Sequence, residues 1–255
     1  MFHRPLITII TVVYNGENDI ESTILSVLNQ DFNNYEFIII DGKSTDGTLS
    51  IIQQFNEKVD KVLSEKDLGI YDAMNKGILK SNGKWIYFLN CGDQLFDKTI
   101  LSKVAQDLEN NVIDFLYGNC IIKNKFNKGS VLKAKNFDYI NYGMPFCHQS
   151  VFVESNILKN NLFDLKFKLV ADFNFFYTLF LKQNYKYKKV EFTISIYDLD
   201  GVSNSINSFN EMYEIIRNHN SFFNFFTIFH RIRLIKFYCS ARIKYIVKKL
   251  FNETF

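Results

Sequence analysis

Three aspartates, each placed after a predicted strand, are the side chains of this sequence best suited to chemistry. They are Asp41, Asp67 and Asp93. Carboxylates gathered at one place disfavour one another's charge unless a cation or hydrogen-bond donors offset it. Asp93 ends a polar turn behind an apolar run, and a divalent ion that carries a diphosphate needs only one or two such carboxylates. Asp93 is therefore a candidate metal ligand, although an aspartate there also suits the cap of a turn or helix that begins near Asp97.

The elements that position these aspartates alternate between strand and helix over the first 97 residues. Apolar runs predict strands at 6–13, 36–40, 61–64 and 85–89, with helices at about 17–29, 48–55 and 70–80. Glu17 and Asp19 suit the dipole of the first of these helices. The alternation predicts right-handed βαβ units and a mostly parallel α/β sheet flanked by helices. The turns after the strands then share one edge, where Tyr14 and Asn15 join the aspartates.

Polar residues of the second half are candidates for acid–base chemistry or for binding. Asp172 lies in the first turn of a predicted helix at 170–181, among large apolar residues. It either complements the helix dipole or, facing a hydroxyl in an apolar pocket, serves as a general base. His148 and Gln149 open a predicted strand that runs to 153. His148 either donates to a phosphate or acceptor oxygen or is a satisfied structural histidine.

The other predicted elements of the second half are a helix at 98–108, a strand at 114–118, a basic surface hairpin at 119–135 and two short strands within 185–197. The aromatic rings of Phe137, Tyr139 and Tyr142 suit the apolar face of a sugar, and they suit an ordinary core at least as well. A polar glycine loop at 198–204 either closes over a ligand or forms a surface turn.

The composition is that of a globular chain. Its 255 residues are 47% hydrophobic, and a net charge of +3 is too small to argue for a nucleic-acid partner. The four cysteines form no C-x-x-C pair, which favours a reducing compartment. Neither a signal peptide nor an apolar run of about 18 residues is found. No G-x-G-x-x-G follows the first strand and no Walker loop occurs, which disfavours nicotinamide and P-loop sites.

The last fifty residues differ in character. Phenylalanines interleave with arginines and lysines, and no acidic residue lies between Asn218 and Asn252. A helix of this kind suits an anionic membrane surface, and docking on the chain's own domain or on a partner is the alternative. The sequence therefore predicts a domain at 1–205, in two halves at 1–97 and 98–205, followed by a basic tail at 206–255.

Four motifs, in order, resemble those of the family 2 glycosyltransferases, which have the nucleotide-diphospho-sugar transferase (GT-A) fold. They are Ile-Thr-Val-Val-Tyr-Asn at 10–15, Ile-Ile-Asp-Gly-Lys-Ser-Thr-Asp-Gly-Thr at 39–48, Ser-Glu-Lys-Asp-Leu-Gly-Ile-Tyr-Asp-Ala-Met-Asn-Lys-Gly at 64–77 and Phe-Leu-Asn-Cys-Gly-Asp at 88–93. The resemblance covers about residues 5 to 205 and implies a nucleotide-binding half at 1–97 and an acceptor half at 98–205. It departs from the family at Gly92, where the metal motif usually has the first of two adjacent acids.

The resemblance implies a role for each candidate residue. Asp41 contacts the nucleotide base, Asp93 holds Mg²⁺ or Mn²⁺ on the diphosphate, and Asp172 is the general base. The residues implied to complete the donor pocket are Thr11, Tyr14, Asn15, Asp67 and Asn75.

The reaction implied is inverting transfer of a hexose, expected to be UDP-linked, to a hydroxyl of a glycan or lipid-linked saccharide in capsule or lipopolysaccharide synthesis. The implied place is the cytoplasm, with the tail as a contact to the inner face of the membrane. Two alternatives stay open. A nucleotidyltransferase would carry a basic glycine-rich loop after the first strand, where this chain has the acidic Tyr14-Asn15-Gly16-Glu17. A non-catalytic membrane-surface adaptor would use the tail alone.

Overall fold

The computed structural model describes residues 4–124, 127–198 and 206–219. The chain divides into two compact units, 1–201 and 202–255, and the first holds all nine described strands in one sheet. The strands are β1 (Ile7–Val13), β2 (Tyr35–Asp41), β3 (Lys61–Ser64), β4 (Trp85–Phe88), β5 (Gln94–Leu95), β6 (Phe115–Asn124), β7 (Asn127–Leu132), β8 (Val151–Glu154) and β9 (Tyr187–Asp198). The helices are α1 (Ile20–Leu28), α2 (Thr48–Gln53), α3 (Ile70–Lys80), α4 (Ile100–Asn110), α5 (Ser155–Asn160), α6 (Ala171–Lys182) and α7 (Ile206–His219), with 3-10 turns η1 (Phe137–Tyr142) and η2 (His148–Ser150).

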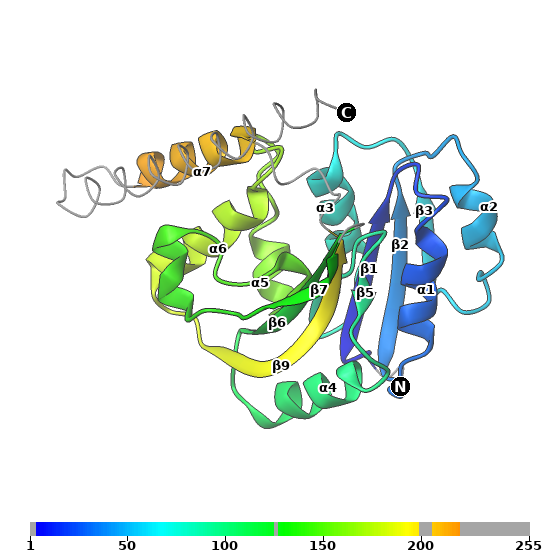
Figure 1. Cartoon of the computed structure of the whole chain (residues 1–255), viewed down its shortest axis with the longest axis horizontal. Helices are drawn as coiled ribbons and strands as arrows, with labels where there is room; N and C mark the ends of the chain where they lie inside the picture. The colour runs from blue at the N-terminus through cyan, green and yellow to red at the C-terminus, as the bar shows by residue number, and fades with distance from the viewer. Residues whose placement is uncertain (1–3, 125–126, 199–205, 220–255) are drawn as a thin grey trace. The chain divides into compact units, whose positions relative to one another are not determined.

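The first four strands form the parallel part of the sheet, in the order β3-β2-β1-β4. Every residue of β1 and of β4 is buried, which explains their unbroken apolar sequences. Strand β1 lies between α3 and α1, so helices cover both faces (Figure 1). The expected βαβ organisation is confirmed here, and the expected bounds of β3 and α3 are those of the structure. The carboxyl ends of these strands, and the turns that follow them, share one edge.

The sheet becomes mixed beyond β4, where the sequence had suggested a mostly parallel arrangement. Strand β8 runs antiparallel to both β4 and β6, while β9 runs parallel to β6. The expected two short strands within 185–197 are instead the single strand β9, whose register against β6 shifts near Asn119. An irregularity inside one long strand produces the same break in the apolar pattern as a turn between two strands.

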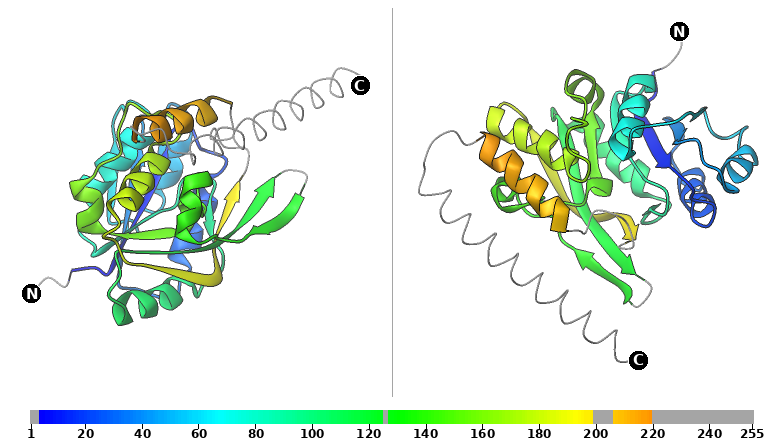
Figure 2. Two further views of the ribbon diagram at one scale, coloured as in Figure 1. Left: turned by 90° about the vertical axis from the view of Figure 1, so that its left-hand side faces the viewer. Right: turned by 90° about the horizontal axis from the view of Figure 1, so that it is seen from above.

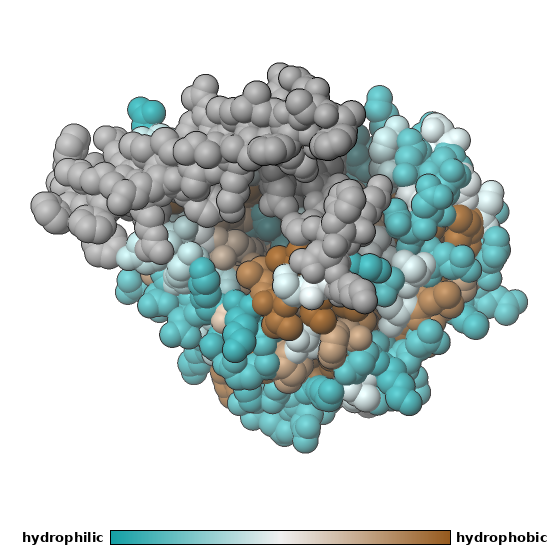
Figure 3. Space-filling model, in the orientation of Figure 1, coloured by the Kyte–Doolittle hydropathy of each residue, from teal (hydrophilic) through white to brown (hydrophobic). Residues whose placement is uncertain are grey.

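The expected basic hairpin is present as β6 and β7, which extend past their neighbours (Figure 2). It is longer than expected, because β6 begins at Phe115 inside the core and reaches Asn124. Val131 and Leu132 of β7 are exposed apolar residues. The space-filling view shows hydrophobic residues gathered near the middle of one otherwise mostly hydrophilic face (Figure 3).

Two helices pack on one face of the parallel strands through a continuous apolar core. Ile20, Ile24 and Val27 of α1 and the buried side of α4 meet β1, β2 and β4 there. On the opposite face α3 comes so close to β1 that a Cβ added at Gly77 would lie 2.6 Å from Ile10 Cγ2. Helix α1 begins at Ile20, later than expected, so Asp19 lies at its N-cap and Glu17 before the helix. The Glu17 carboxylate instead accepts a 2.6 Å hydrogen bond from the backbone N–H of Gly47.

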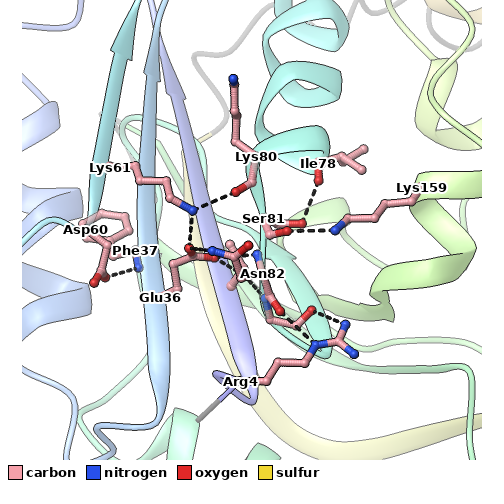
Figure 4. Close-up of polar contacts among 12 residues, drawn as sticks. Arg4, Glu36, Phe37, Asp60, Lys61, Ile78, Lys80, Ser81, Asn82 and Lys159 are labelled. Carbon is pink, nitrogen blue, oxygen red and sulfur yellow. Dashed lines mark hydrogen bonds and ion pairs between the residues drawn. The ribbon is translucent and has the colours of Figure 1, made fainter. Parts of the chain in front are cut away.

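A buried carboxylate holds the amino-terminal edge of the sheet together, at the opposite end from the turns described above (Figure 4). Glu36 of β2 accepts hydrogen bonds from Thr8 Oγ1 (2.8 Å), Lys61 Nζ (2.6 Å) and both the backbone and side-chain nitrogens of Asn82 (2.8 Å each). These groups come from β1, β3 and the turn before β4. They keep the pKa of Glu36 below its usual value although burial acts the other way.

The second unit is described only for α7. Arg217 and His219 lie in the last turn of this helix. The rest of the predicted basic tail, and most of the polar loop at 198–204, lie outside the described residues. Among the residues that are described, no helix is both long and apolar enough to cross a membrane.

Candidate active site

The turns after β1 and β2 are joined by hydrogen bonds. Asn15 donates its backbone N–H to Ser44 Oγ (2.8 Å), and its side-chain Oδ1 accepts the backbone N–H of Thr45 (2.8 Å). Asn15 adopts a positive φ of 50°, which asparagine tolerates better than most residues. Asn15 therefore lies in the turn after β1, as predicted, and its side-chain oxygen accepts a hydrogen bond from the neighbouring turn.

Asp41 lies at the end of β2 and is fully buried. Its Oδ1 accepts the Ser44 hydroxyl (2.5 Å), and its Oδ2 accepts the Ser64 hydroxyl (2.6 Å) and the Ser44 backbone N–H (3.1 Å). These three donors satisfy the hydrogen-bonding capacity of the buried carboxylate within the fold. Asp41 thus fixes the turn after β2 to the end of β3, a contact that its resemblance-based role did not include.

Asp67 lies beside the turn after β2. A Cβ added at Gly42 would lie 2.5 Å from Asp67 Oδ2 and 3.4 Å from the Cβ of Tyr14. The other oxygen, Oδ1, accepts the backbone N–H of Gly69 at 2.9 Å. The ring-bearing residue Tyr14 is 64% exposed. Because residue 42 is glycine, the Asp67 carboxylate can lie against this turn, close to the backbone of the exposed residue Tyr14.

The turn after β4 explains why Gly92 departs from the acidic motif. Gly92 has a φ of +95°, which side chains disfavour, and its N–H donates to Thr23 Oγ1 (3.0 Å). Thr23 Oγ1 in turn donates to the carbonyl of Asp93 (2.9 Å), and the Asp93 N–H donates to the carbonyl of Asn90 (3.0 Å). The backbone of this turn is thus specified by glycine, and an aspartate at position 92 would be strained.

Asp93 is only 4% exposed, so it lies beneath the edge rather than at its lip. Its charge contributes, after burial, to raising the pKa of Tyr87 and, with Asp19, to raising that of the Cys91 thiol to about 12. These effects indicate a negative potential around the turn. Close by in the chain, Asn90 Oδ1 is buried without a hydrogen-bond partner in the described structure.

The residues of this turn fit a divalent cation chemically. Asn90 Oδ1 and the Asp93 carboxylate are hard oxygen donors, and the negative potential favours a cation. Within the described ranges, however, no group of three or more His, Cys, Asp or Glu side chains is arranged to hold a metal. Such a site therefore depends on oxygen atoms of a ligand for the rest of its coordination.

Asp172 lies in the first turn of α6, as predicted, and contacts two ring-bearing residues. Its Oδ1 accepts a 2.8 Å hydrogen bond from the hydroxyl of Tyr71, which lies in the first turn of α3. Its Oδ2 lies 3.5 Å from His148 Nδ1. The His148 ring stacks on Phe88, the last residue of β4, with centroids 5.4 Å apart. Asp172 is therefore held at the end of β4 and the start of α3, beside the edge that carries the other aspartates.

Two predicted donor-pocket residues have hydrogen-bond partners within the fold. Thr11 is fully buried and donates to the carbonyl of Leu89 (2.7 Å), which ties β1 to the end of β4. Asn75 is 8% exposed and exchanges two 2.9 Å hydrogen bonds with the backbone of Phe163. Both residues therefore support the structure, and their part in a donor pocket stays a prediction.

The remaining predicted residues divide between site and core. Gln149 is buried, and its Oε1 lies 3.0 Å from the Cys147 thiol. Of the three aromatic candidates, Phe137 is buried in a cluster of rings and Tyr142 is exposed. The third, Tyr139, has the ammonium group of Lys135 over its ring. The core interpretation therefore holds for Phe137.

Two residues beside the candidate site, Tyr71 and Asn90, had no individual role among the predictions from the sequence. Tyr71 was included only within a segment, and its reach to Asp172 spans 101 positions of the chain. Asn90 lies two residues beyond Phe88, the last residue of β4, whose ring stacks on His148. Its place in the turn that ends at Asp93 was the signal that could have marked it as a candidate.

Comparison with known proteins gives consistent matches. The sequence profile described as "Glycosyl transferase family 2" matches residues 8–186. A curated Escherichia coli relative, UDP-Glc:alpha-D-GlcNAc-diphosphoundecaprenol beta-1,3-glucosyltransferase WfgD, is 29% identical over 212 residues, 81% of this chain and 82% of that one.

Two solved structures share the fold. One is S. aureus TarS 1-349 in complex with UDP-GlcNAc, with a TM-score of 0.69, 20% identity and coverage of 84% of this chain. The other is the mannosyltransferase PcManGT from Pyrobaculum calidifontis in complex with GDP-Man and Mn²⁺, with a TM-score of 0.61, 15% identity and coverage of 83%. The chain spans 65% and 61% of those two solved chains.

Proposed function

The chain belongs to glycosyl transferase family 2 and has the GT-A fold, and within that family we propose that it transfers a sugar, with inversion, from a nucleotide-diphospho-sugar to an acceptor hydroxyl. The observation that carries this proposal is the placement of Asp172, between Tyr71 and His148, beside the sheet edge that bears Asp41, Asp67 and Asp93. A base next to a candidate diphosphate site is the arrangement that direct displacement requires.

In the proposed step, Asp172 takes the proton of the acceptor hydroxyl as its oxygen attacks the anomeric carbon. The bond from that carbon to the diphosphate breaks, and its electron pair stays on the diphosphate. Positioned general-base assistance of this kind is typically worth about 10²–10⁴ in rate. Phe88 and Phe163 pack near the His148 ring and help to keep water from this side of the carboxylate.

We propose a UDP-linked hexose as the donor. In this proposal the exposed ring of Tyr14 supplies a flat apolar surface for the uracil base. The nearby Asp67 supplies a carboxylate that accepts the N–H of that base. The proposal is supported by the UDP-Glc in the name of the E. coli relative and by the UDP-GlcNAc in the TarS complex.

The proposed cofactor is Mg²⁺ or Mn²⁺, held by Asp93 with Asn90 Oδ1 as a second oxygen ligand. The Mn²⁺ of the mannosyltransferase complex supports the use of a divalent ion. When bound, the ion would neutralise charge that grows on the diphosphate. The residues of this chain then have only to hold the ion and the donor in register with Asp172.

The proposed acceptor is a glycan or lipid-linked saccharide of cell-surface polysaccharide synthesis. Support comes from the name of the E. coli relative, whose acceptor is a diphosphoundecaprenol-linked sugar. A position at the inner face of the membrane stays a prediction, because the basic tail on which it rests lies outside the described residues.

A panel of UDP- and GDP-linked sugars tests the proposal. The full chain is melted with each nucleotide sugar, with Mn²⁺ and with a chelator, and the release of the free nucleoside diphosphate is then measured for each hit. We expect at least one UDP-sugar to raise the melting temperature in Mn²⁺ and to be turned over. Stabilisation and turnover by none of them would overturn the proposed function.

A further inference from the structure

We propose that Tyr71 is the positioning residue of the base Asp172, and that its single phenolic proton adapts to both protonation states of that carboxylate. This inference rests on the proposed function, because it assigns a role to a neighbour of the proposed base. Tyr71 acts through Asp172 and is not itself a group that touches the reacting atoms.

The hydroxyl of Tyr71 lies between two acceptors. It is 2.8 Å from Asp172 Oδ1 and 3.1 Å from the backbone carbonyl of Leu169. The residue is 8% exposed, and its ring packs against Phe163 with centroids 5.4 Å apart. Packing therefore fixes the ring, and the hydroxyl hydrogen is left to rotate between the two oxygens.

Counting protons shows what this geometry does. While Asp172 is charged, both neighbours of the Tyr71 oxygen are acceptors, and the stronger bond goes to the carboxylate. When Asp172 has taken the proton of the acceptor hydroxyl, Oδ1 is a weaker acceptor and the Tyr71 proton turns to the carbonyl of Leu169. The phenol therefore keeps a hydrogen bond in both states, so neither state of the base leaves its hydroxyl unpaired in a buried place.

The two carboxylate oxygens of Asp172 thus have different duties. Oδ1 is held by Tyr71, so the incoming proton goes to Oδ2, the oxygen that His148 Nδ1 faces at 3.5 Å. Within the described part of the chain, two titratable side chains contact Asp172, namely Tyr71 of α3 and His148 of η2. Burial lowers the pKa of His148, so the ring is neutral and carries no positive charge that could pair with the Asp172 carboxylate. Tyr71 is then the neighbour that supports the charged form.

Tyr71 also ties the base to the proposed donor side. It stands two residues beyond Gly69, whose N–H binds Asp67, and next to Asp72, whose carboxylate accepts the N–H of Leu68 at 3.0 Å. The turn that positions Asp67 therefore runs directly into the residue that positions Asp172. A shift of this turn on donor binding moves the base by the same rigid connection.

The test replaces Tyr71 by phenylalanine in the full chain, with Tyr35→Phe as a matched control. Tyr35 is the first residue of β2, at the opposite end of this strand from Asp41, and its hydroxyl lies 3.5 Å from the backbone carbonyl of Val27. The probe is the release of UDP from the UDP-sugar that turns over in the wild type, measured as kcat and KM against pH. In parallel, aspartate carboxyl carbons labelled with ¹³C are titrated by NMR, and Asp172→Asn identifies the signal.

Loss of a donor makes a carboxylate easier to protonate. We expect Tyr71→Phe to move the acidic limb of the kcat profile and the ¹³C titration of Asp172 to higher pH by about one unit, the size of one lost hydrogen bond. The KM for the UDP-sugar should be unchanged, and Tyr35→Phe should move neither curve. In the Asp172→Asn background, Tyr71→Phe should cost no further activity.

An unmoved ¹³C titration in a folded Tyr71→Phe variant would overturn the inference, whatever happens to the rate. So would a further large loss of activity in the Asp172→Asn background. These outcomes are distinguishable from failure of the proposed function, which would appear as absence of turnover in the wild type, because the ¹³C titration needs no substrate.

Discussion

His148 Nδ1 lies 3.5 Å from Asp172 Oδ2, and neither nitrogen of the ring has a hydrogen-bond partner in the described structure. The side chain is 10% exposed and is stacked on Phe88. Burial lowers the pKa of His148, and the charge of Asp172 only partly opposes this effect. A neutral imidazole with one donor and one acceptor nitrogen therefore lies beside the proposed base. The hydroxyl of a bound acceptor is the group that could form a hydrogen bond with it.

The lowered pKa of His148 predicts how stability changes with pH. The unfolded state takes up a proton near pH 6.5, before the folded state does, so the contribution of His148 is complete above about pH 6.5 and is lost as pH falls through the lower folded pKa. Between pH 7 and pH 5, we expect the free energy of unfolding to fall less in His148→Asn than in the wild type. The two slopes against pH should differ by the equivalent of at most about one bound proton. Urea melts across this range measure it. Equal slopes would show that the ring titrates as it does in water.

Replacing Asp172 by asparagine tests the base directly. We expect kcat for UDP-sugar turnover to fall by about 10²–10⁴, because the amide cannot accept the acceptor proton, while the Kd for the donor changes little. Initial rates and calorimetric titration of the donor measure the two quantities. Asp164→Asn, at an exposed position shortly before α6, is the matched control and should keep full activity. Undiminished turnover in Asp172→Asn would remove this residue from its role.

Replacing Asp93 by asparagine tests the metal site. The amide keeps the shape of the buried side chain but removes the charge that attracts a cation, so the Kd for the UDP-sugar in Mn²⁺ should rise by about 10- to 100-fold. In a chelator, the variant and the wild type should bind the donor equally weakly. Calorimetry under both conditions provides the comparison. If the variant kept the metal-dependent gain in affinity, the ion would have to lie elsewhere.

The parallel half of the fold was predictable because its information is local. Strands β1 and β4 are buried along their whole length and β2 along nearly all of it, so these three appear as apolar runs with a polar turn behind them. The start of α6 was predicted at 170 on the same local basis, one residue before its observed start at Ala171. The edge on which the turns gather then follows from the parallel direction of these strands.

The contacts that decide the roles of the polar residues were not predictable, because their partners lie far along the chain. Tyr71 and Asn75 are four residues apart on α3 and so share a face. One of them reaches Asp172 and the other binds the backbone of Phe163. Nothing near either residue in the sequence distinguishes a site residue from a structural one, and only the packing of α3 against the later segments does so.

Glu36 provides a prediction about stability that is independent of function. Glu36→Gln removes the charge that Lys61, Thr8 and Asn82 bind, and we expect a loss of about 2 kcal/mol in the free energy of unfolding at pH 7. Because the pKa of Glu36 is lowered on folding, its contribution is present above the unfolded value of about 4.5 and is lost as pH falls below it. Urea melts at pH 7 and pH 3.5 measure both effects. The exposed Glu57→Gln is the control, and an equal loss there would contradict the prediction.

Gly42→Ala tests whether Asp67 belongs to the donor pocket. The new methyl group would lie 2.5 Å from Asp67 Oδ2, so the carboxylate has to turn away, whereas the core is untouched. We expect the Kd for the UDP-sugar to rise about tenfold, the equivalent of one lost hydrogen bond to a charged group, with little change in melting temperature. Gly47→Ala is the matched control, since its methyl group would displace only the end of the Glu17 side chain. Unchanged donor affinity in Gly42→Ala would exclude Asp67 from the pocket, because the native position of its carboxylate is incompatible with a methyl group there.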